Sequence, residues 1–183
     1  MEHTSIPQDE LDLFESLQDI RVVFDVGARS DDEYVKIKPD VELHAFEPNP
    51  AFFEELSLKL KDRPNTYLNN FGLADYTGNM LYNEGRQCFV GGEEVSIKMG
   101  TLLLELKTLD DYVREHGIEQ IDFLKIDTEG YDFRVLLGGL ETLKKCRYIQ
   151  YEHWNDKRRF HILLGQQFEM KPIGNRNIFC TRL

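Results

Sequence analysis

The stretch RVVFDVGARSDDEYVKIKPDVELHAFEP, residues 21–48, contains two short apolar runs, Val22 to Val26 and Val41 to Phe46. A short polar and charged segment separates the two runs. Short runs rich in β-branched and aromatic residues, joined by a helix, are typical of a βαβ unit with buried parallel strands. Ligands of such sheets bind beyond the carboxyl ends of the strands. The stretch therefore predicts a ligand site where these two strands end.

The residues at the two strand ends favour a nucleoside as the ligand. Asp25, Gly27 and Ala28 lie at the end of the first strand, and Glu47 and Pro48 lie at the end of the second. The step from Gly27 to Glu47 is about 20 residues, the usual spacing between a glycine turn and the acidic residue that binds a ribose. Glycine lets a ligand lie against the backbone, and a carboxylate can accept hydrogen bonds from both ribose hydroxyls.

The residues after Gly27 indicate which nucleoside to expect. A dinucleotide needs three spaced glycines that seat its pyrophosphate on a helix start. This chain has Arg29, Ser30, Asp31 and Asp32 there instead. The two aspartates would repel a pyrophosphate, and they would suit a ligand with a cationic centre such as a sulfonium. An alternative without a ligand stays open, in which Gly27 ends a strand and Asp31 caps a helix.

Length, composition and charge limit the class of protein. The 183 residues predict one domain, 1–183, and 41% hydrophobic with 30% charged residues is typical of a globular chain. The net charge of -11 argues against nucleic-acid binding, which depends on clustered lysines and arginines. No stretch reaches the roughly 20 apolar residues of a membrane span, and the first residues lack a signal-peptide pattern. We expect a cytoplasmic protein without a membrane span, and a homo-oligomer stays open.

Segments on either side of the quoted stretch predict further helices and a third strand. Apolar positions among acidic residues predict an amphipathic helix from Asp9 to Leu17, within an N-terminal helical cover of residues 1–20. A second helix is predicted from Pro50 to about Lys61. Thr66 to Phe71 is the third predicted strand. The turn predicted after it, Gly72 to Asp75, offers small and apolar groups against which an adenine could lie.

The irregular region 77–107 predicts an inserted loop and hairpin on the substrate side of the sheet. Several glycines surround its short β pieces, of which the last runs from Leu102 to Leu106. Variable loops on a rigid scaffold often carry recognition, so this region is where we expect the acceptor to be selected. The candidate contacts are Tyr76, Tyr82, Arg86 and Phe89.

The second half of the chain predicts two more parallel strands and a hairpin. Ile121 to Ile126 is almost continuously apolar, as in a central strand buried on both faces, and it leads to Asp127 and Glu129. A fifth strand leads to Glu152 and His153. The last segment divides at a proline and glycine turn and predicts a terminal β hairpin. The seven strands predict an α/β fold with an antiparallel pair at the end of a mostly parallel sheet.

With these segments in view, the chain resembles the FkbM-type methyltransferases, a family of S-adenosylmethionine-dependent enzymes. The resemblance covers roughly residues 21–153, and its most specific part is LKIDTEG. The segments that carry it are FDVGA (24–28), HAFEPNP (44–50), FGLAD (71–75), TLDDYV (108–113), FLKIDTEGYDFRVLLGG (123–139) and YIQYEHW (148–154). It implies the class I methyltransferase (Rossmann-like) fold, a seven-stranded, mostly parallel sheet with helices on both faces and a C-terminal β hairpin.

The resemblance also implies a binding site for S-adenosylmethionine. Residues of the FDVGA segment would border its methionine part. Glu47 would hold the ribose hydroxyls, while Leu73 and Ala74 would border the adenine ring. Asp127 would lie where the cofactor meets the substrate. The predicted cofactor-binding residues are Asp25, Gly27, Ala28, Arg29, Glu47, Pro48, Leu73, Ala74 and Asp127.

One loop departs from the family pattern. Members usually continue the first motif as GAN-x-G, whereas here Arg29, Ser30 and Asp31 follow Ala28, without the second glycine. Arg29 could instead pair with the carboxylate of the ligand. The departure keeps open an alternative function as a non-catalytic S-adenosylmethionine-binding or partner subunit. An NAD-dependent oxidoreductase is a further alternative, against which the missing glycine triplet argues.

The resemblance implies methyl transfer, an in-line displacement in which the protein aligns the acceptor with the methyl carbon. We predict O-methylation of a small-molecule hydroxyl acceptor, on a sugar, lipid or secondary metabolite. The hydroxyl proton must pass to a carboxylate or histidine. The candidate catalytic residues are Asp127, Glu129 and His153. As an alternative, Asp127, Glu129, Glu152 and His153 would hold Mg or Mn, since carboxylate and imidazole groups suit these ions.

Overall fold

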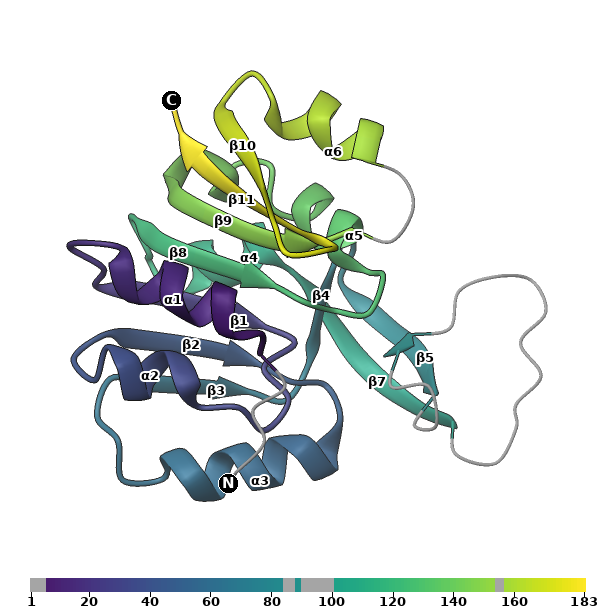
Figure 1. Cartoon of the computed structure of the whole chain (residues 1–183). Helices are drawn as coiled ribbons and strands as arrows, with labels where there is room; N and C mark the ends of the chain where they lie inside the picture. Colours follow the sequence, from purple (N-terminus) through teal and green to yellow (C-terminus); the bar gives the residue numbers. More distant parts are fainter. Residues whose placement is uncertain (1–5, 84–87, 90–100, 154–156) are drawn as a thin grey trace.

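The main sheet of the computed structural model, which describes residues 6–83, 88–89, 101–153 and 157–183, has the strand order β10-β11-β9-β8-β1-β2-β3 (Figure 1). These strands are β1 (Val22–Val26), β2 (Glu42–Phe46), β3 (Thr66–Asn69), β8 (Ile121–Ile126), β9 (Cys146–Glu152), β10 (Phe168–Ile173) and β11 (Asn177–Arg182). β11 runs antiparallel to β9 and to β10, and the other neighbouring strands pair in parallel. The predicted seven-stranded, mostly parallel sheet with a C-terminal hairpin is confirmed.

Helices cover both faces of this sheet, as predicted. α1 (Gln8–Ser16), α2 (Glu33–Ile37) and α3 (Pro50–Leu60) pack on one face. The other face is covered by α4 (Leu109–Glu115), α5 (Asp132–Leu137), the 3-10 helix η1 (Thr142–Lys145) and α6 (Lys157–Leu164). Each face buries its own cluster of apolar side chains, and this burial drives the layers together. Within the described ranges, no helix is long and apolar enough to cross a membrane.

Short sequence signals explain where some helices begin. The side-chain oxygen of Asn49 accepts a hydrogen bond from the N–H of Ala51 at 3.0 Å, and Pro50 occupies the first helical position of α3. The Thr108 hydroxyl likewise accepts from the N–H of Asp111 at the start of α4. Helix α2 begins after Asp32, not after Asp31, and the Asp32 side chain makes no capping bond.

A second, four-stranded sheet extends to one side of the main sheet (Figure 1). Its strands, in the order β4-β7-β5-β6, are β4 (Gly72–Ala74), β7 (Thr101–Thr108), β5 (Gly78–Asn83) and β6 (Cys88–Phe89). The prediction of a turn at Gly72 to Asp75 is wrong for its first three residues, which pair in parallel with β7. Their partner lies far along the chain, so local sequence gave no signal for the pairing. Arg86 and the side chain of Phe89 lie outside the described residues.

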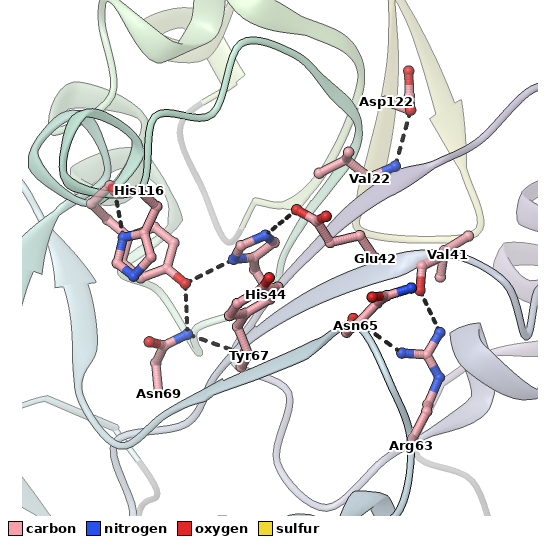
Figure 2. Close-up of polar contacts among 11 residues, drawn as sticks. Val22, Val41, Glu42, His44, Arg63, Asn65, Tyr67, Asn69, His116 and Asp122 are labelled. Carbon is pink, nitrogen blue, oxygen red and sulfur yellow. Dashed lines mark hydrogen bonds and ion pairs between the residues drawn. The ribbon is translucent and has the colours of Figure 1, made fainter.

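A buried polar network, the interior cluster, lies between β2, β3 and α4 and consists of Glu42, His44, Asn69, Tyr112 and His116 (Figure 2). The Nδ1 of His44 lies 2.7 Å from the Tyr112 hydroxyl, and its Nε2 lies 2.9 Å from a Glu42 carboxylate oxygen. The Asn69 amide donates to the same hydroxyl at 3.2 Å. The hydroxyl therefore donates its own proton to Nδ1, and the Nε2–H donates to Glu42.

The interior cluster holds His44 in its neutral form. Burial lowers the pKa of His44, and the nearby His116 acts in the same direction, while Glu42 opposes both. The rings of Tyr112 and His116 stack with centroids 4.0 Å apart, and the rings of His44 and Tyr67 stack at 4.6 Å. Ring packing on both sides thus fixes the network in one arrangement.

Candidate functional site

A cavity of about 210 Å³ opens at the carboxyl edge of the main sheet, beyond β1, β2 and β8. Its lining consists of Val26, Gly27, Arg29, Phe46, Glu47, Pro48, Phe52, Gly72, Leu73, Tyr82, Lys125, Asp127, Thr128 and Glu129. Residues of β4 and β5 close one side, so the second sheet contributes to the wall. The cavity lies at the place where the sequence predicts a ligand, because parallel strands of such sheets end at one edge.

Gly27 allows the turns after β1 and β8 to approach each other. Its φ is +81°, and a Cβ added to it would lie 1.9 Å from the carbonyl oxygen of Asp127. Any larger residue would therefore collide with backbone. The N–H groups of Gly27 and Ala28 both donate to the carbonyl oxygen of Phe46, at 2.9 and 3.1 Å. The tight packing of backbone thus requires glycine here even before a ligand is considered.

Glu47 presents a fixed carboxylate to the cavity. Its side chain accepts hydrogen bonds from the N–H of Arg29 at 2.9 Å and from the N–H of Asn49 at 2.7 Å, one on each oxygen. The residue is only 5% exposed, and this burial raises the pKa of Glu47 to about 7 against the effect of the two hydrogen bonds. Each oxygen keeps a further lone pair that can accept from a ligand hydroxyl.

Arg29 has an unusual backbone for a non-glycine residue. Its φ of +54° lies in the left-handed region, which L-residues other than glycine, asparagine and aspartate rarely adopt. The hydrogen bond from its N–H to Glu47 holds this conformation. The guanidinium lies over the ring of Phe52 at 4.8 Å from the centroid. Arg29 and Phe52 thereby form one wall of the cavity together.

A buried lysine lies at the base of the cavity. The Nζ of Lys125 is 3.2 Å from Oδ1 of Asp25 and 3.7 Å from Oδ2 of Asp127. The side chains of Lys125 and Asp25 are 5% and 4% exposed, whereas that of Asp127 is 45% exposed. Burial alone would lower the pKa of Lys125, but the two aspartates raise it well above its ordinary value. Lys125 is therefore a permanent positive charge beneath the site.

Further buried polar groups lie around this lysine, and we call Glu10, Asp25, Tyr34, Lys125 and Gln150 the edge cluster. Gln150 is the β9 partner of Lys125 in the ladder, and its amide donates to Glu10 at 2.5 Å. Burial raises the pKa of Glu10 to about 7, although Lys125 opposes this. Among the described residues, no hydrogen-bond partner is present for the Tyr34 hydroxyl or the Gln150 Oε1.

Asp132 joins the loops that follow β8 and β9. One carboxylate oxygen accepts from the Thr128 hydroxyl at 2.7 Å and from the Thr128 N–H at 3.3 Å. The other accepts from the N–H of Glu152 at 2.9 Å. Burial raises the pKa of Asp132 to about 7. This side chain therefore fixes Thr128, a cavity residue, relative to the end of the neighbouring strand.

The predicted cofactor-binding residues divide into two groups. Those that line the cavity are Gly27, Arg29, Glu47, Pro48, Leu73 and Asp127. The other three, Asp25, Ala28 and Ala74, are buried behind the lining. Asp25 still contacts a lining residue, because it pairs with Lys125. The structure thus gathers most of these residues at one edge, and their roles toward a cofactor stay predictions.

The candidate catalytic residues are also divided. Asp127 and Glu129 line the cavity, and burial together with Asp127 raises the pKa of Glu129. His153 does not line it. The His153 N–H donates to the Arg176 carbonyl oxygen at 3.0 Å, and burial and Lys157 lower the pKa of its imidazole. Among the described residues, no three acidic, histidine or cysteine side chains are grouped to hold a metal, and the metal set with Glu152 stays a prediction.

Sequence reasoning missed several residues of the site. Lys125 had a visible signal, since it is the only charged residue in the run from Phe123 to Ile126. Asp132 gave a weaker signal as an acidic residue at a helix start. Thr128 lies within the LKIDTEG segment, although no role was predicted for it. Phe52 gave no signal, because an aromatic on an amphipathic helix is a common feature of globular proteins.

The family described as Methyltransferase FkbM domain matches residues 25–170. The chain belongs to this family.

Curated relatives of this FkbM-family chain are methyltransferases by name. It is 23% identical to 2-O-methyltransferase NoeI of Sinorhizobium fredii, over 76% of this chain and 65% of the relative. It is 24% identical to hexuronic acid methyltransferase AglP of Haloferax volcanii, over 75% of this chain and 57% of the relative. The chain therefore spans about three fifths of the length of these relatives.

Solved structures share the fold at low sequence identity. The methyltransferase FkbM of Methylobacillus flagellatus superposes with a TM-score of 0.60 at 14% identity, over 91% of this chain and 47% of that one. Fibrillarin of Aeropyrum pernix, solved with natively bound S-adenosyl-L-methionine, gives a TM-score of 0.53 at 12% identity, over 94% of this chain and 73% of that one. These likenesses confirm the predicted class I methyltransferase fold.

Proposed function

We propose that this FkbM-family chain binds S-adenosylmethionine in the edge cavity and methylates a hydroxyl of a sugar, lipid or secondary metabolite. The observation that carries the proposal is the Glu47 carboxylate, which is buried, fixed by two backbone N–H groups and directed to the cavity wall. Two relatives are named as a 2-O-methyltransferase and a hexuronic acid methyltransferase, which supports a hydroxyl-bearing saccharide as one acceptor class.

The residues present fit this cofactor. Glu47 has lone pairs free to accept from the two ribose hydroxyls, since each of its oxygens receives a single backbone N–H. Leu73 and Pro48 offer apolar surface to an adenine ring. Asp127, whose side chain is 45% exposed, would face the cationic methionine end. A carboxylate wall with apolar flanks matches the chemistry of an adenosyl sulfonium.

When bound, the cofactor supplies an electrophilic methyl group. The chain itself has three tasks in the reaction: to align the acceptor hydroxyl, to exclude water and to remove the hydroxyl proton. Glu129 suits the third task, because it lines the cavity and its pKa is raised toward neutrality. Asp127 is the other carboxylate within the cavity. His153, with a lowered pKa, is neutral at pH 7 and would accept a proton only from an acceptor that reaches beyond the lining.

Calorimetry with S-adenosylhomocysteine tests the cofactor site directly. Glu47→Ala should weaken binding by about ten-fold or more, because two hydroxyl hydrogen bonds to a buried carboxylate are lost. Glu54→Ala is the matched control, an exposed glutamate of α3 that does not line the cavity. Unchanged affinity in Glu47→Ala would remove Glu47 from the site. Binding of NAD in place of S-adenosylhomocysteine would overturn the methyltransferase proposal.

The acceptor is found by screening. Candidate acceptors are incubated with methyl-labelled cofactor, with and without chelator. They fall into three classes: hydroxyl-bearing saccharides such as uronic acids, lipids, and aromatic metabolites. Transfer that Glu129→Gln abolishes and that chelator leaves intact would assign the proton to a carboxylate. Cofactor binding without transfer to any acceptor class would favour a non-catalytic subunit.

A further inference from the structure

Lys125 is the unexpected residue of the central strand. The run from Phe123 to Ile126 is apolar except for this lysine, whose side chain is 5% exposed. A buried ion pair is weak evidence for a purely structural role, because apolar residues of similar volume often give equal or greater stability. A role of Lys125 in the cavity above it would explain why a lysine occupies this position.

The contacts of Lys125 link the interior of the sheet to the cavity. Its partner across the β1–β8 ladder is Asp25, and the two charges lie 3.2 Å apart. The same ammonium lies 3.7 Å from the Asp127 carboxylate, which is 45% exposed at the end of the strand. A carboxylate at an exposed strand end would otherwise sample several rotamers. The lysine approaches it from below and limits this freedom.

The surroundings of Lys125 favour an ammonium at this place. The groups that face it are Glu10 of α1, Asp25 of β1, Tyr34 of α2, Gln150 of β9 and Asp127 after β8. Two of these side chains, Tyr34 and Gln150, offer oxygen atoms that have no hydrogen-bond partner among the described residues. Acidic and hydrogen-bond-accepting groups thus surround one buried cation.

We propose that Lys125 is a positioning residue, whose buried ammonium holds the Asp127 carboxylate toward the cavity, where it meets the cationic end of the cofactor. The inference rests on the proposed function, because Asp127 acts here only if an adenosyl sulfonium occupies the cavity. Lys125 affects cofactor binding through Asp127 and does not contact the cofactor itself. Its second contact, with Asp25, anchors the ammonium so that it does not follow the exposed carboxylate outward.

A double-mutant cycle separates this role from a structural one. The variants are Lys125→Met, Asp127→Asn and the double variant, each measured by calorimetry with S-adenosylmethionine in the absence of an acceptor. Methionine keeps the length of the side chain and removes the charge. Lys125→Met should weaken binding by about ten-fold in the wild-type background and by less than about two-fold in the Asp127→Asn background. Lys107→Met is the control, since it removes a lysine that pairs with Glu115 outside the cavity.

Equal losses of affinity in both backgrounds would overturn the inference, because Lys125 would then act independently of Asp127. Should Lys125→Met fail to fold, Asp25→Asn/Lys125→Met replaces it in the cycle, since that pair also removes the buried carboxylate that lies 3.2 Å from the ammonium. A crystal structure of the variant gives a second measurement. The Asp127 side chain should turn from the cavity or lose its density, and an unchanged rotamer would contradict the inference. Failure of the wild-type chain to bind S-adenosylmethionine would contradict the proposed function, while the crystal structure would still test the positioning.

Discussion

The interior cluster and the edge cluster are both buried polar networks on the same sheet, but they differ in how completely they are paired. In the interior cluster, the His44 ring nitrogens and the Tyr112 hydroxyl all have partners at 2.7 to 3.2 Å. In the edge cluster, Asp25 pairs with Lys125, but the Tyr34 hydroxyl and the Gln150 Oε1 have no hydrogen-bond partner among the described residues. The side chains of the edge cluster are buried, and so are His44 and Tyr112 of the interior cluster, so an unpaired atom on any of these groups has a free-energy cost.

The difference indicates what each cluster does. A fully paired network contributes stability and a single arrangement of the core. Unpaired buried groups persist where another requirement outweighs their cost, and such places are often functional sites. The edge cluster lies directly under the cavity, whereas the interior cluster lies beneath its apolar wall, with Tyr112 packed against Phe46 at 4.7 Å. We therefore expect substitutions in the edge cluster to change ligand binding, and substitutions in the interior cluster to change stability alone.

The largest expected effect comes from breaking the ion pair of the edge cluster. Lys125→Met should lower the free energy of unfolding by about 3–5 kcal/mol, because Asp25 would be left as a buried, unpaired carboxylate. Asp25→Asn/Lys125→Met should recover most of this loss. Urea unfolding of the three proteins provides the measurement. If the double variant is as unstable as the single one, the loss of stability comes from altered packing and not from the unpaired charge of Asp25.

The second prediction uses pH, because the clusters respond in opposite directions. The pKa of Glu10 is raised from 4.5 to about 7 in the folded chain, so its contribution is present at low pH and is lost as pH rises from about 4.5 to 7. The change should be about 2–3 kcal/mol, and Glu10→Gln should remove it. The pKa of His44 is lowered, so its contribution is lost as pH falls below 6.5.

Urea unfolding of the wild type, Glu10→Gln and His44→Gln between pH 5 and 8 measures both contributions. Glu10→Gln should reduce the loss of stability as pH rises, to which Glu47 and Asp132 also contribute, and His44→Gln should reduce the loss as pH falls. A Glu10→Gln profile parallel to that of the wild type would show that Glu10 titrates normally, and the contrast between the clusters would be lost.

The third prediction concerns the interior cluster. Tyr112→Phe removes the hydroxyl that joins His44 to Asn69 and leaves the His44 Nδ1 without its partner, while the Asn69 amide keeps the carbonyl oxygens of Ala45 and Tyr67. The free energy of unfolding should fall by about 1–3 kcal/mol. The affinity for S-adenosylhomocysteine should stay within about two-fold of the wild type, since no polar atom of the cavity changes. A large loss of affinity would show that the two clusters are coupled.

The smallest expected effect is at the exposed end of the interior cluster. His116 stacks on Tyr112 and is exposed to solvent. His116→Leu keeps an apolar contact with that ring, so the free energy of unfolding at pH 8 should change by less than about 0.5 kcal/mol. Thermal unfolding beside Tyr112→Phe measures this. A loss as large as that of Tyr112→Phe would mean that the imidazole is an essential member of the network.

Local sequence patterns predicted the scaffold of the molecule well. Apolar runs such as Ile121 to Ile126 indicate buried strands because nearly every side chain must be apolar in a sheet covered on both faces. Gly27 and Glu47 could be placed at one edge for the same reason, since parallel strands have a common direction. The helix that begins at Pro50 was predicted because its capping residues are adjacent in sequence.

Contacts between distant segments could not be predicted in this way. Strand β4 pairs with β7, which lies far along the chain, and its three residues were predicted as a turn from their local sequence. Glu10 contacts Gln150 and Asn177, which lie far along the chain, and nothing in the sequence of a short amphipathic helix reveals such a partner. The approach of Lys125 to Asp127 depends on a side-chain direction that periodicity does not specify.

The place of β11 in the sheet has a consequence for synthesis on the ribosome. This strand lies between β9 and β10 and is translated after both. Until it emerges, the outer edge of β9 presents unpaired N–H and carbonyl groups, which are prone to pairing with other chains. The nascent protein therefore stays vulnerable to aggregation until residues 177–182 have left the exit tunnel, and a ribosome that pauses just before them would extend that period.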